Sequence, residues 1–306
     1  MTMKLFSSLL LGLTLASCST MRSPIVPGAV PKDHGLIGAG EGPAWKDGSL
    51  YFTDGKHINR MDPKGHTTVF RHNASNGLLF NREGRLVACE SGLRRVTRTE
   101  KDRRITVLAD RFEGKRFNTP NDLCMDSKGR IYFTDPRYGP RESMELGYEG
   151  VYRIDAVGKV TRIRCDGAER PNGILITPDD KYLFIADNNN NNHGGSRKLL
   201  RYELDKNGDV KSGSRKVIFD RKDGRGPDGM KMDAAGRIYV AAGTNKVTEW
   251  ETNRFKAGCY ILSPSGHLID FIPTAPDEAR NCAFGGKDGK TLFITSGNHL
   301  WSVPLR

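Results

Sequence analysis

A two-strand pattern recurs six times along this 306-residue chain and limits what the chain can fold into. Each copy opens on a residue with a side-chain oxygen, enters an apolar run, passes through a short turn and ends in a second apolar run. The opening residue and the end of the second run lie 13 to 15 residues apart in every copy, whereas successive copies start 35 to 56 residues apart. This combination predicts rigid β-hairpins joined by loops of variable length. The six opening residues are Glu41, Asn76, Asn121, Asn172, Asp228 and Asn281.

The repeat predicts an all-β fold, a six-bladed β-propeller with four-stranded antiparallel blades. Further strand candidates follow the hairpins, such as residues 150–155 and 160–165, and four strands in six units is the arithmetic of such a propeller. The last unit lacks a strand, and residues 32–40 at the other end of the chain are the candidate closing strand, which would remove two open sheet edges. A pair of β-sandwiches is the alternative fold, but it does not require a constant hairpin unit.

The first 18 residues have the character of an export signal. A basic Lys4 precedes an apolar stretch from Leu9 to Leu15 and then small residues, and the stretch is too short to span a membrane. The ending "LASC" resembles a bacterial lipobox, in which Cys18 would be lipidated and would tether the protein to a membrane surface. An ordinary secretory signal with an incidental cysteine is the alternative. We therefore expect a signal over 1–18, a polar tether over 19–31 and a propeller over 32–306, in the periplasm or cell envelope of a bacterium.

Net charge and cysteine content exclude several other classes of protein. The net charge is +12, with a local basic cluster from Arg94 to Arg104. An exported protein rarely meets nucleic acid, so we expect no nucleic-acid partner and interpret the cluster as an exposed outer strand and hairpin. The charge better suits an anionic envelope surface. The five cysteines after Cys18 are odd in number and lack a C-x-x-C pair, which supports neither a disulfide framework nor a zinc ribbon. Whether two of these cysteines form one disulfide stays open.

The six opening residues predict a metal site. In a propeller the first strand of each blade lines the central channel, so equivalent residues converge on one ring. Every member of this ring carries a side-chain oxygen, and oxygen-only ligands are the preference of Ca²⁺, whereas zinc favours His and Cys. One divalent ion, with Ca²⁺ ahead of Zn²⁺, Mn²⁺ and Mg²⁺, is therefore expected. The alternative is that Asn-Gly and Asp-Gly only make turns; six at equivalent positions favour the metal.

The motifs "EGPAW" at 41–45, "PND" at 120–122, "RPNG" at 170–173 and "GPDGM" at 226–230 occur in this order. Together they resemble the SMP-30/gluconolactonase/LRE-like family of six-bladed propeller hydrolases, a superfamily that includes diisopropyl-fluorophosphatase and a drug-responsive lactonase. The resemblance spans roughly residues 35–306.

The resemblance implies particular site residues. The family binds its catalytic divalent metal through the Glu, Asn and Asp of three of these motifs, which match Glu41, Asn172 and Asp228. The third-blade Asn, matched by Asn121, ligates the metal in some members and contacts substrate in others. Asp122 follows it, as in the lactonase and fluorophosphatase types, and is expected to contact substrate.

One family feature is displaced in this chain. Sugar-lactone members of the animal type carry an Arg-x-Asn in the third blade, but here Arg116 and Asn118 lie before the motif. This departure weakens D-glucono-lactone as the specific substrate. The loop over 137–150 is expected to help set specificity.

Three functions are compatible with these residues. The first is divalent-metal-dependent hydrolysis of a small cyclic ester, a gluconolactonase-like lactonase activity. In it, the ion polarises the carbonyl and Asp228 activates water or attacks directly. The second keeps the site and takes a phosphotriester. The third is a non-enzymatic propeller whose ion is structural and whose upper loops bind a ligand. All three imply a small-molecule or ligand partner, with membrane contact only through Cys18.

Overall fold

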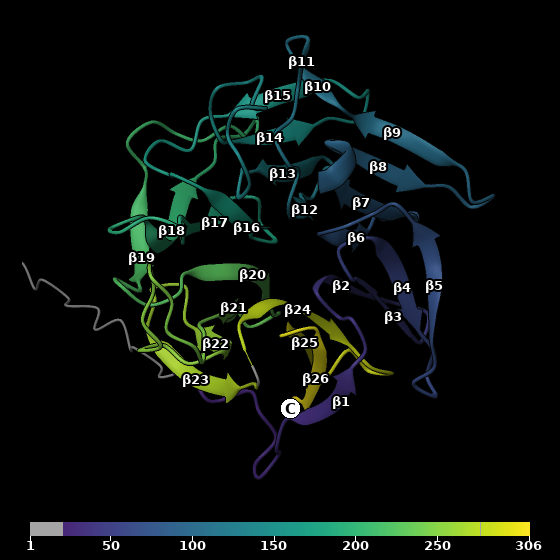
Figure 1. The fold of residues 1–306 in the computed structure, drawn as a ribbon, viewed down its shortest axis with the longest axis vertical. Helices are drawn as coiled ribbons and strands as arrows, with labels where there is room; N and C mark the ends of the chain where they lie inside the picture. Colours follow the sequence, from purple (N-terminus) through teal and green to yellow (C-terminus); the bar gives the residue numbers. More distant parts are fainter. Residues whose placement is uncertain (1–20, 276) are drawn as a thin grey trace, which may run out of the picture.

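The fold is a six-bladed β-propeller, as the repeat predicts. A computed structural model describes residues 21–275 and 277–306, and it arranges six four-stranded antiparallel sheets around a central axis (Figure 1). The inner strand of each blade contacts the inner strands of both neighbouring blades, which closes the ring. Within the described part of the chain, the one helix is the short 3₁₀ turn η1 (Ser91–Leu93), and no helix is long and apolar enough to cross a membrane.

The strands follow one another outward in each of the first five blades. Blade 1 contains β2 (Glu41–Lys46), β3 (Ser49–Thr53), β4 (His57–Met61) and β5 (Thr67–His72). Blade 2 contains β6 (Leu78–Phe80), β7 (Leu86–Glu90), β8 (Arg95–Thr99) and β9 (Ile105–Ala109). Blade 3 contains β12 (Leu123–Met125), β13 (Ile131–Asp135), β14 (Gly150–Ile154) and β15 (Val160–Ile163), preceded by a hairpin of β10 (Arg111–Phe112) and β11 (Lys115–Arg116).

The remaining blades have the same plan. Blade 4 contains β16 (Pro171–Ile176), β17 (Tyr182–Asn188), β18 (Arg197–Glu203) and β19 (Lys216–Asp220). Blade 5 contains β20 (Pro227–Met232), β21 (Ile238–Ala242), β22 (Gly258–Leu262) and β23 (Leu268–Pro273). Blade 6 contains β24 (Ala279–Gly285), β25 (Thr291–Ser296) and β26 (His299–Pro304). We call the end of the propeller where the innermost strands begin the upper face, and the opposite end the lower face.

The sixth blade takes its outermost strand from the start of the propeller, as the sequence predicts. Strand β1 (Lys32–Leu36) pairs antiparallel with β26, so that Lys32 lies opposite Ser302 and Leu36 opposite His299. Figure 1 shows the purple β1 beside the yellow strands of blade 6. The first and last strands of the propeller, β1 and β26, thus share one sheet, and separating them would open two sheet edges.

Much of the predicted tether is bonded to the propeller. Ile25 forms a bridge with Leu305, and the amide of Arg306 donates to the carbonyl oxygen of Pro24 at 2.8 Å. Ile25 and Ala29 also pack against the apolar core around Leu305. The export signal and Cys18 lie outside the described residues.

Apolar side chains hold neighbouring blades together. For example, Val87 and Cys89 of blade 2 share one buried cluster with Phe133 and Tyr152 of blade 3. This arrangement explains the near-continuous apolar runs of the second strands, because each is covered on both faces by adjacent blades. The five described cysteines are all free, and Cys89, Cys259 and Cys282 are buried.

The basic cluster from Arg94 to Arg104 lies in a hairpin, as predicted, but its strand is largely buried and not exposed. It covers β8, the third strand of blade 2, and the turn that follows, whereas the outermost strand is β9. Several of its side chains are paired with acids: Arg95 with Glu90 at 2.6 Å and Arg98 with Glu100 at 2.6 Å.

Candidate functional site

The six opening residues lie at the upper ends of the innermost strands or just before them, and neighbouring members adjoin around the channel. Asn281 of blade 6 donates through Nδ2 to Oε2 of Glu41 in blade 1 at 3.1 Å, so the first and last repeats meet there. The hydroxyl of Thr53 donates to the carbonyl oxygen of Asn76 at 3.1 Å. The hydroxyl of Thr134 donates to the carbonyl oxygen of Asn172 at 2.6 Å. The two threonine bonds each join one blade to the next. The bond between Asn281 and Glu41, which are 240 positions apart in sequence, completes the ring.

Glycines beside the opening residues allow the blades to approach this closely. A Cβ on Gly42, Gly77, Gly173 or Gly229 would lie within 3.0 Å of the next blade's opening residue or the residue after it. At Gly173 the atom approached is the carbonyl oxygen of Asp228. Of these four, Gly42 alone has a positive φ, so the other three are needed for close packing and not for a left-handed turn. The Asn-Gly and Asp-Gly pairs therefore have a packing role that the turn interpretation does not include.

Asn281 organises two of the acidic side chains. Its Nδ2 donates to Glu41 and, at 3.4 Å, to Oδ2 of Asp122, while its Oδ1 accepts the amide of Cys282 at 2.9 Å. Its carboxamide thus presents N–H groups to the carboxylates, with the oxygen turned away to the backbone. Asp122 lies one residue beyond the ring position, and its other oxygen accepts the amide of Leu123 at 2.9 Å. The predicted contact between Asp122 and substrate stays a prediction.

Two ring residues have buried oxygens without partners. Oδ1 of Asp228 and Oδ1 of Asn76 are buried and accept no hydrogen bond from any described residue. An unsatisfied buried oxygen is costly, and a cation is one way to satisfy it. Asn121 and Asn172 are buried beside them, and neither side-chain oxygen accepts a hydrogen bond from the described part of the chain. Of the four predicted ligands, Asn121, Asn172 and Asp228 thus each keep a side-chain oxygen that accepts no hydrogen bond from the described chain, whereas Oε2 of Glu41 accepts from Asn281 and from the amide of Gly42.

Burial and mutual repulsion raise the pKa values of the acids at the ring. Burial, followed by the nearby charge of Asp122, raises the pKa of Glu41 to about 7, and Arg280 opposes the rise. Burial and then the charge of Glu41 raise the pKa of Asp228 well above its usual value, opposed by Arg225. Carboxylates that repel each other in a buried site are stabilised by a divalent cation, which reverses the sign of the local field.

A tyrosine from the third blade fixes one ring carboxamide. Nδ2 of Asn172 donates to the hydroxyl of Tyr138 at 2.8 Å, and this hydroxyl donates to the carbonyl oxygen of Asn188 at 3.3 Å. Because the NH₂ group of Asn172 is held in this way, its oxygen is left to face another group. Tyr138 comes from the loop over 137–150, whose sequence gave no reason to single it out.

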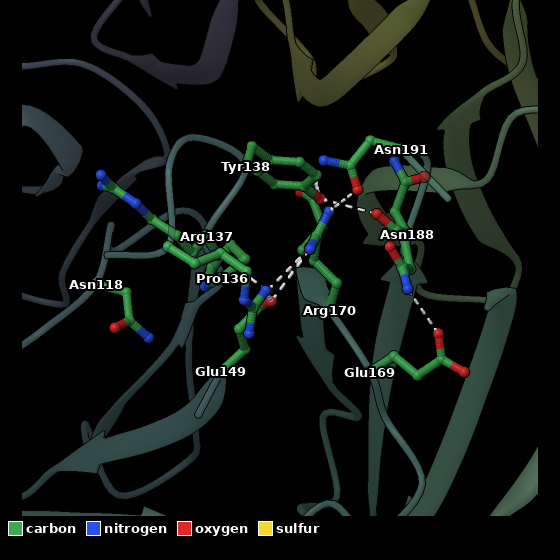
Figure 2. Close-up of polar contacts among 12 residues, drawn as sticks. Asn118, Pro136, Arg137, Tyr138, Glu149, Glu169, Arg170, Asn188 and Asn191 are labelled. Atoms are coloured by element: carbon green, nitrogen blue, oxygen red, sulfur yellow. Dashed lines mark hydrogen bonds and ion pairs between the residues drawn. The ribbon is translucent and has the colours of Figure 1, made fainter. Parts of the chain in front are cut away.

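The Tyr138 side chain is itself held by a polar cluster at the rim. Figure 2 shows Arg170 beside Tyr138, with bonds to Glu149 and Asn191; the guanidinium carbon lies 5.2 Å from the ring centroid. Nε of Arg170 is 3.0 Å from Glu149, and both side chains are buried. Arg170 thus links the asparagine-rich loop after β17 to the loop after β13.

A second rim cluster places two cations next to the ring acids. Glu278 accepts from Arg225 at 2.8 Å and from Arg280 at 2.6 Å, so that one carboxylate holds both guanidinium groups. The charge of Arg280 lowers the pKa of Glu41, and that of Arg225 lowers the pKa of Asp228. Arg280 directly precedes Asn281, but nothing in the motif set identifies it. Neither Arg116 nor Asn118, the displaced family pair, has a hydrogen bond to a ring residue: Arg116 is in β11, and Asn118 donates to the carbonyl oxygens of Asp135 and Tyr148.

The donor set fits a hard cation better than zinc. Among the described residues, no group of three or more His, Cys, Asp and Glu side chains is arranged to hold a metal, and four of the six ring members are carboxamides. Carboxylate and amide oxygens are the ligands that Ca²⁺ takes, six to eight at a time. The unpartnered oxygen of Asp228 and the constrained carboxamide of Asn172 match that chemistry.

Comparison with known proteins agrees with the fold and the motifs. The family model of the SMP-30/gluconolactonase/LRE-like region matches residues 39–298. The chain is 32% identical to a gluconolactonase of Zymomonas mobilis over 87% of this chain and 78% of that protein. It is 26% identical to a pentonolactonase of Haloferax volcanii over 84% of this chain and 81% of that one. A gluconolactonase structure from Xanthomonas campestris superposes with a TM-score of 0.77, at 29% identity and 92% coverage of both chains. The chain belongs to the SMP-30/gluconolactonase/LRE-like family.

Proposed function

We propose that this protein is a divalent-metal-dependent lactonase whose site lies at the upper end of the central channel. The observation that carries the proposal is the closed ring of oxygen-bearing side chains, in which a buried Asp228 oxygen has no partner among the described residues. Relatives named for lactone hydrolysis support the reaction class. The reaction adds water across the acyl C–O bond of a cyclic ester and yields a hydroxy acid.

Glu41, Asn121, Asn172 and Asp228 are the residues that we assign to the ion, with Ca²⁺ the best match to their oxygens. When bound, the ion supplies Lewis-acid polarisation of the ester carbonyl. The Tyr138 hydroxyl orients Asn172, and Asn281 orients Glu41.

The chain's own groups supply the rest of the chemistry. Asp228 accepts a proton from the attacking water, because it is buried beside the ring centre and has an oxygen that no described residue occupies. Arg225 and Arg280, fixed by Glu278, place positive charge next to the ring acids, where negative charge develops on the substrate oxygen. Asn121 is assigned to the substrate as well as to the ion, and Asp122 contacts Asn281 at the same level.

The test is a hydrolysis screen of the purified protein against aldonolactones of five- and six-membered rings, with phosphotriesters in parallel. We expect turnover of lactones that EDTA abolishes and Ca²⁺ restores, and little turnover of phosphotriesters. Hydrolysis that survives complete removal of divalent ions would contradict the metal dependence. Absence of lactone turnover, with a bound ion and an intact fold, would favour a ligand-binding propeller.

The raised acid pKa values predict how stability depends on pH and metal. The folded-state pKa of Glu41 is about 7, above its usual value, so its stabilising effect is complete at low pH and is lost as pH rises through 7. The Tm of the metal-free protein should therefore fall between about pH 5 and about pH 8. Calcium should restore it, with a larger gain at the higher pH, because the ion competes with protons. Calorimetric melting at both pH values, with and without Ca²⁺, measures this; equal calcium gains at both would contradict it.

The variant Tyr138→Phe tests the proposed support of Asn172. Loss of the hydroxyl frees the Asn172 carboxamide to rotate, so we expect Ca²⁺ affinity to fall by about 10-fold or more. Titration calorimetry of the metal-free protein measures this without reference to activity. Tyr182→Phe is the matched control, since the hydroxyl of Tyr182 has no hydrogen-bond partner in the described chain. Unchanged affinity in Tyr138→Phe would contradict the positioning role.

A further inference from the structure

A polar cavity lies at the upper rim, next to the proposed lactonase site. It has a volume of about 430 Å³ and lies between the loop after β13 and the asparagine-rich loop after β17. None of the six ring residues lines it, and its volume is within the range of about 300–1,000 Å³ that small-molecule sites have in proteins. The first loop contributes Arg137, Gly139 and Arg141, and the second contributes Asn191 and Asn192.

Buried charged groups fix one wall of this cavity. The side chains of Arg170 and Glu149 both line it, although they are only 5% and 4% exposed, and Nε of Arg170 donates to Glu149 at 3.0 Å. Figure 2 shows that Arg170 also bonds to Asn191, through Nη1 and Oδ1. Arg141 donates to the same Glu149 from the exposed side. Because these bonds hold the lining side chains in place, a ligand would meet a largely preorganised site.

The charges around the cavity nearly balance. Glu149 accepts from two of the three arginines that line it, Arg141 and Arg170. A phosphate or carboxylate bound here would have to compete with Glu149 for these guanidinium groups and would meet a second carboxylate, that of Glu169. The charges therefore favour a neutral ligand over an anion. The charged lining residues are Arg137, Arg141, Glu149, Glu169 and Arg170.

The polar groups still unused at the cavity include both donors and acceptors. Asn191 is bonded through Oδ1 alone, so its Nδ2 donates to no described residue. Asn192 is bonded through Nδ2, to Asn189 at 2.8 Å, so its Oδ1 accepts from no described residue. Oε1 of Glu169 is a further unused acceptor, since Oε2 receives both of its bonds. A sugar hydroxyl both donates and accepts hydrogen bonds, whereas an ionised acid only accepts, so this mixture matches a polyhydroxylated ligand.

Tyr138 stands between the cavity and the ring. Its neighbours in sequence, Arg137 and Gly139, both line the cavity, and the guanidinium carbon of Arg170 lies 5.2 Å from the centroid of its aromatic ring. Its hydroxyl accepts from Nδ2 of Asn172, a ring residue, at 2.8 Å. Arg170 is two residues before Asn172, so their Cα atoms are at most about 7 Å apart. A ligand that occupies both places therefore needs a second unit beyond the lactone ring.

We propose that this cavity is a second sugar subsite, which binds a neutral glycosyl residue attached to the lactone. Asn191 and Asn192 bond to hydroxyl groups of that residue while the lactone lies at the ring. The substrate class is then a glycosylated aldonolactone, in which binding of the distant sugar contributes to lowering the barrier at the ester. This choice of substrate rests on the proposed lactonase function, whereas the binding of a sugar in the cavity does not.

Steady-state kinetics on three lactones tests the choice of substrate. The three are gluconolactone, the same lactone with a hexosyl residue on a secondary hydroxyl, and the same lactone with a phosphate on its primary hydroxyl. We expect kcat/KM to be about 10-fold higher for the glycosylated lactone than for gluconolactone, as one or two additional hydrogen bonds would give, and no gain from the phosphate. Equal values for gluconolactone and the glycosylated lactone, or a larger gain from the phosphate, would overturn the proposal.

Gly139→Leu tests the place of the subsite. Gly139 has no positive φ, and the nearest atoms to its Cβ position belong to the Arg137 guanidinium at 3.8 Å, so leucine fits the backbone and takes up space at the cavity. The preference for the glycosylated lactone should disappear in Gly139→Leu and in the double variant Asn191→Ala and Asn192→Ala, with Tm as the check on folding. Gly92→Leu is the matched control, because Gly92 lies in an upper loop of blade 2 with no atom within 4 Å of its Cβ position. If Gly139→Leu kept the preference, the second sugar would lie elsewhere.

Titration calorimetry separates the subsite from the proposed function. The probe is a disaccharide alditol, which has no ester bond, added to the calcium-loaded protein. It should bind about 10-fold more tightly than the monosaccharide alditol, and the difference should be lost in Gly139→Leu and kept in Gly92→Leu. Absence of this difference in the wild-type protein would overturn the subsite even if lactones are hydrolysed. Binding that Gly139→Leu removes, in a protein that hydrolyses no lactone, would support the subsite and contradict the lactonase function.

Discussion

Asp228→Asn is expected to lower kcat/KM for lactone hydrolysis by about 10²–10⁴-fold, the usual contribution of a positioned acid–base group. The substitution keeps the shape of the side chain and removes one of the acids at the ring together with the proposed proton acceptor. Calcium affinity should fall as well, because a neutral amide replaces a charged ligand. Steady-state kinetics on the best lactone and calcium titration measure the two effects.

The stability of the same variant separates a site effect from unfolding. Burial and the charge of Glu41 raise the pKa of Asp228, so its ionised form destabilises the metal-free fold. Removing that charge should leave the metal-free Tm at neutral pH unchanged or higher while activity is lost. Asp288→Asn, the same change in an exposed turn of blade 6, should alter neither quantity. Full EDTA-sensitive turnover by Asp228→Asn would show that another residue activates the water.

Gly173→Ala is expected to cause a large loss of stability. The new Cβ would lie within 3.0 Å of the backbone carbonyl of Asp228, so two innermost strands must separate to make room. Overpacking of this kind costs about 1–3 kcal/mol, and more where backbone atoms are the obstacle. Urea unfolding of the metal-free protein measures the change.

Gly92→Ala is the matched control for the packing explanation. Gly92 has no atom within 4 Å of its Cβ position and no positive φ, so alanine should fit there without strain. It should be neutral, or stabilising by about 0.4–1 kcal/mol through the unfolded state. If the two variants had the same stability, close packing against Asp228 would not be the reason for the glycine at position 173.

Local pattern was enough to predict the architecture. The 13-to-15-residue unit measured in the sequence ends at the last residue of the second strand in most blades, as at Glu90, Asp135 and Ser296. The missing strand of the last repeat also identified β1 as the closing strand. Both follow from chain-local properties: alternating burial along a strand and a fixed hairpin length. The Arg94–Arg104 cluster was correctly expected to form a hairpin, but charge alone did not show that its strand, β8, is largely buried and that its arginines are paired with acids.

Part of the candidate site could likewise be predicted from the sequence, and part of it could not. Equivalence in the repeats brought the oxygen-bearing residues, from Glu41 to Asn281, onto one ring, and family resemblance selected four as ligands. Neither the repeats nor the resemblance could show that Asn281 turns its N–H groups to the acids, since a carboxamide can present either end.

The sequence by itself determined six hairpins, their closure and the oxygen chemistry of the channel, because each repeat carries the same local information. Only the tertiary structure decided which other side chains serve that ring. Tyr138 reaches Asn172 across 34 residues, and Glu278 joins Arg225 to Arg280 above the ring acids. Tyr138, Glu278 and Arg225 come from upper loops that differ in length and sequence between blades, so no repeat predicts them; Arg280 lies at the start of β24. Their positions are set by packing between blades, which exists only once the ring has closed.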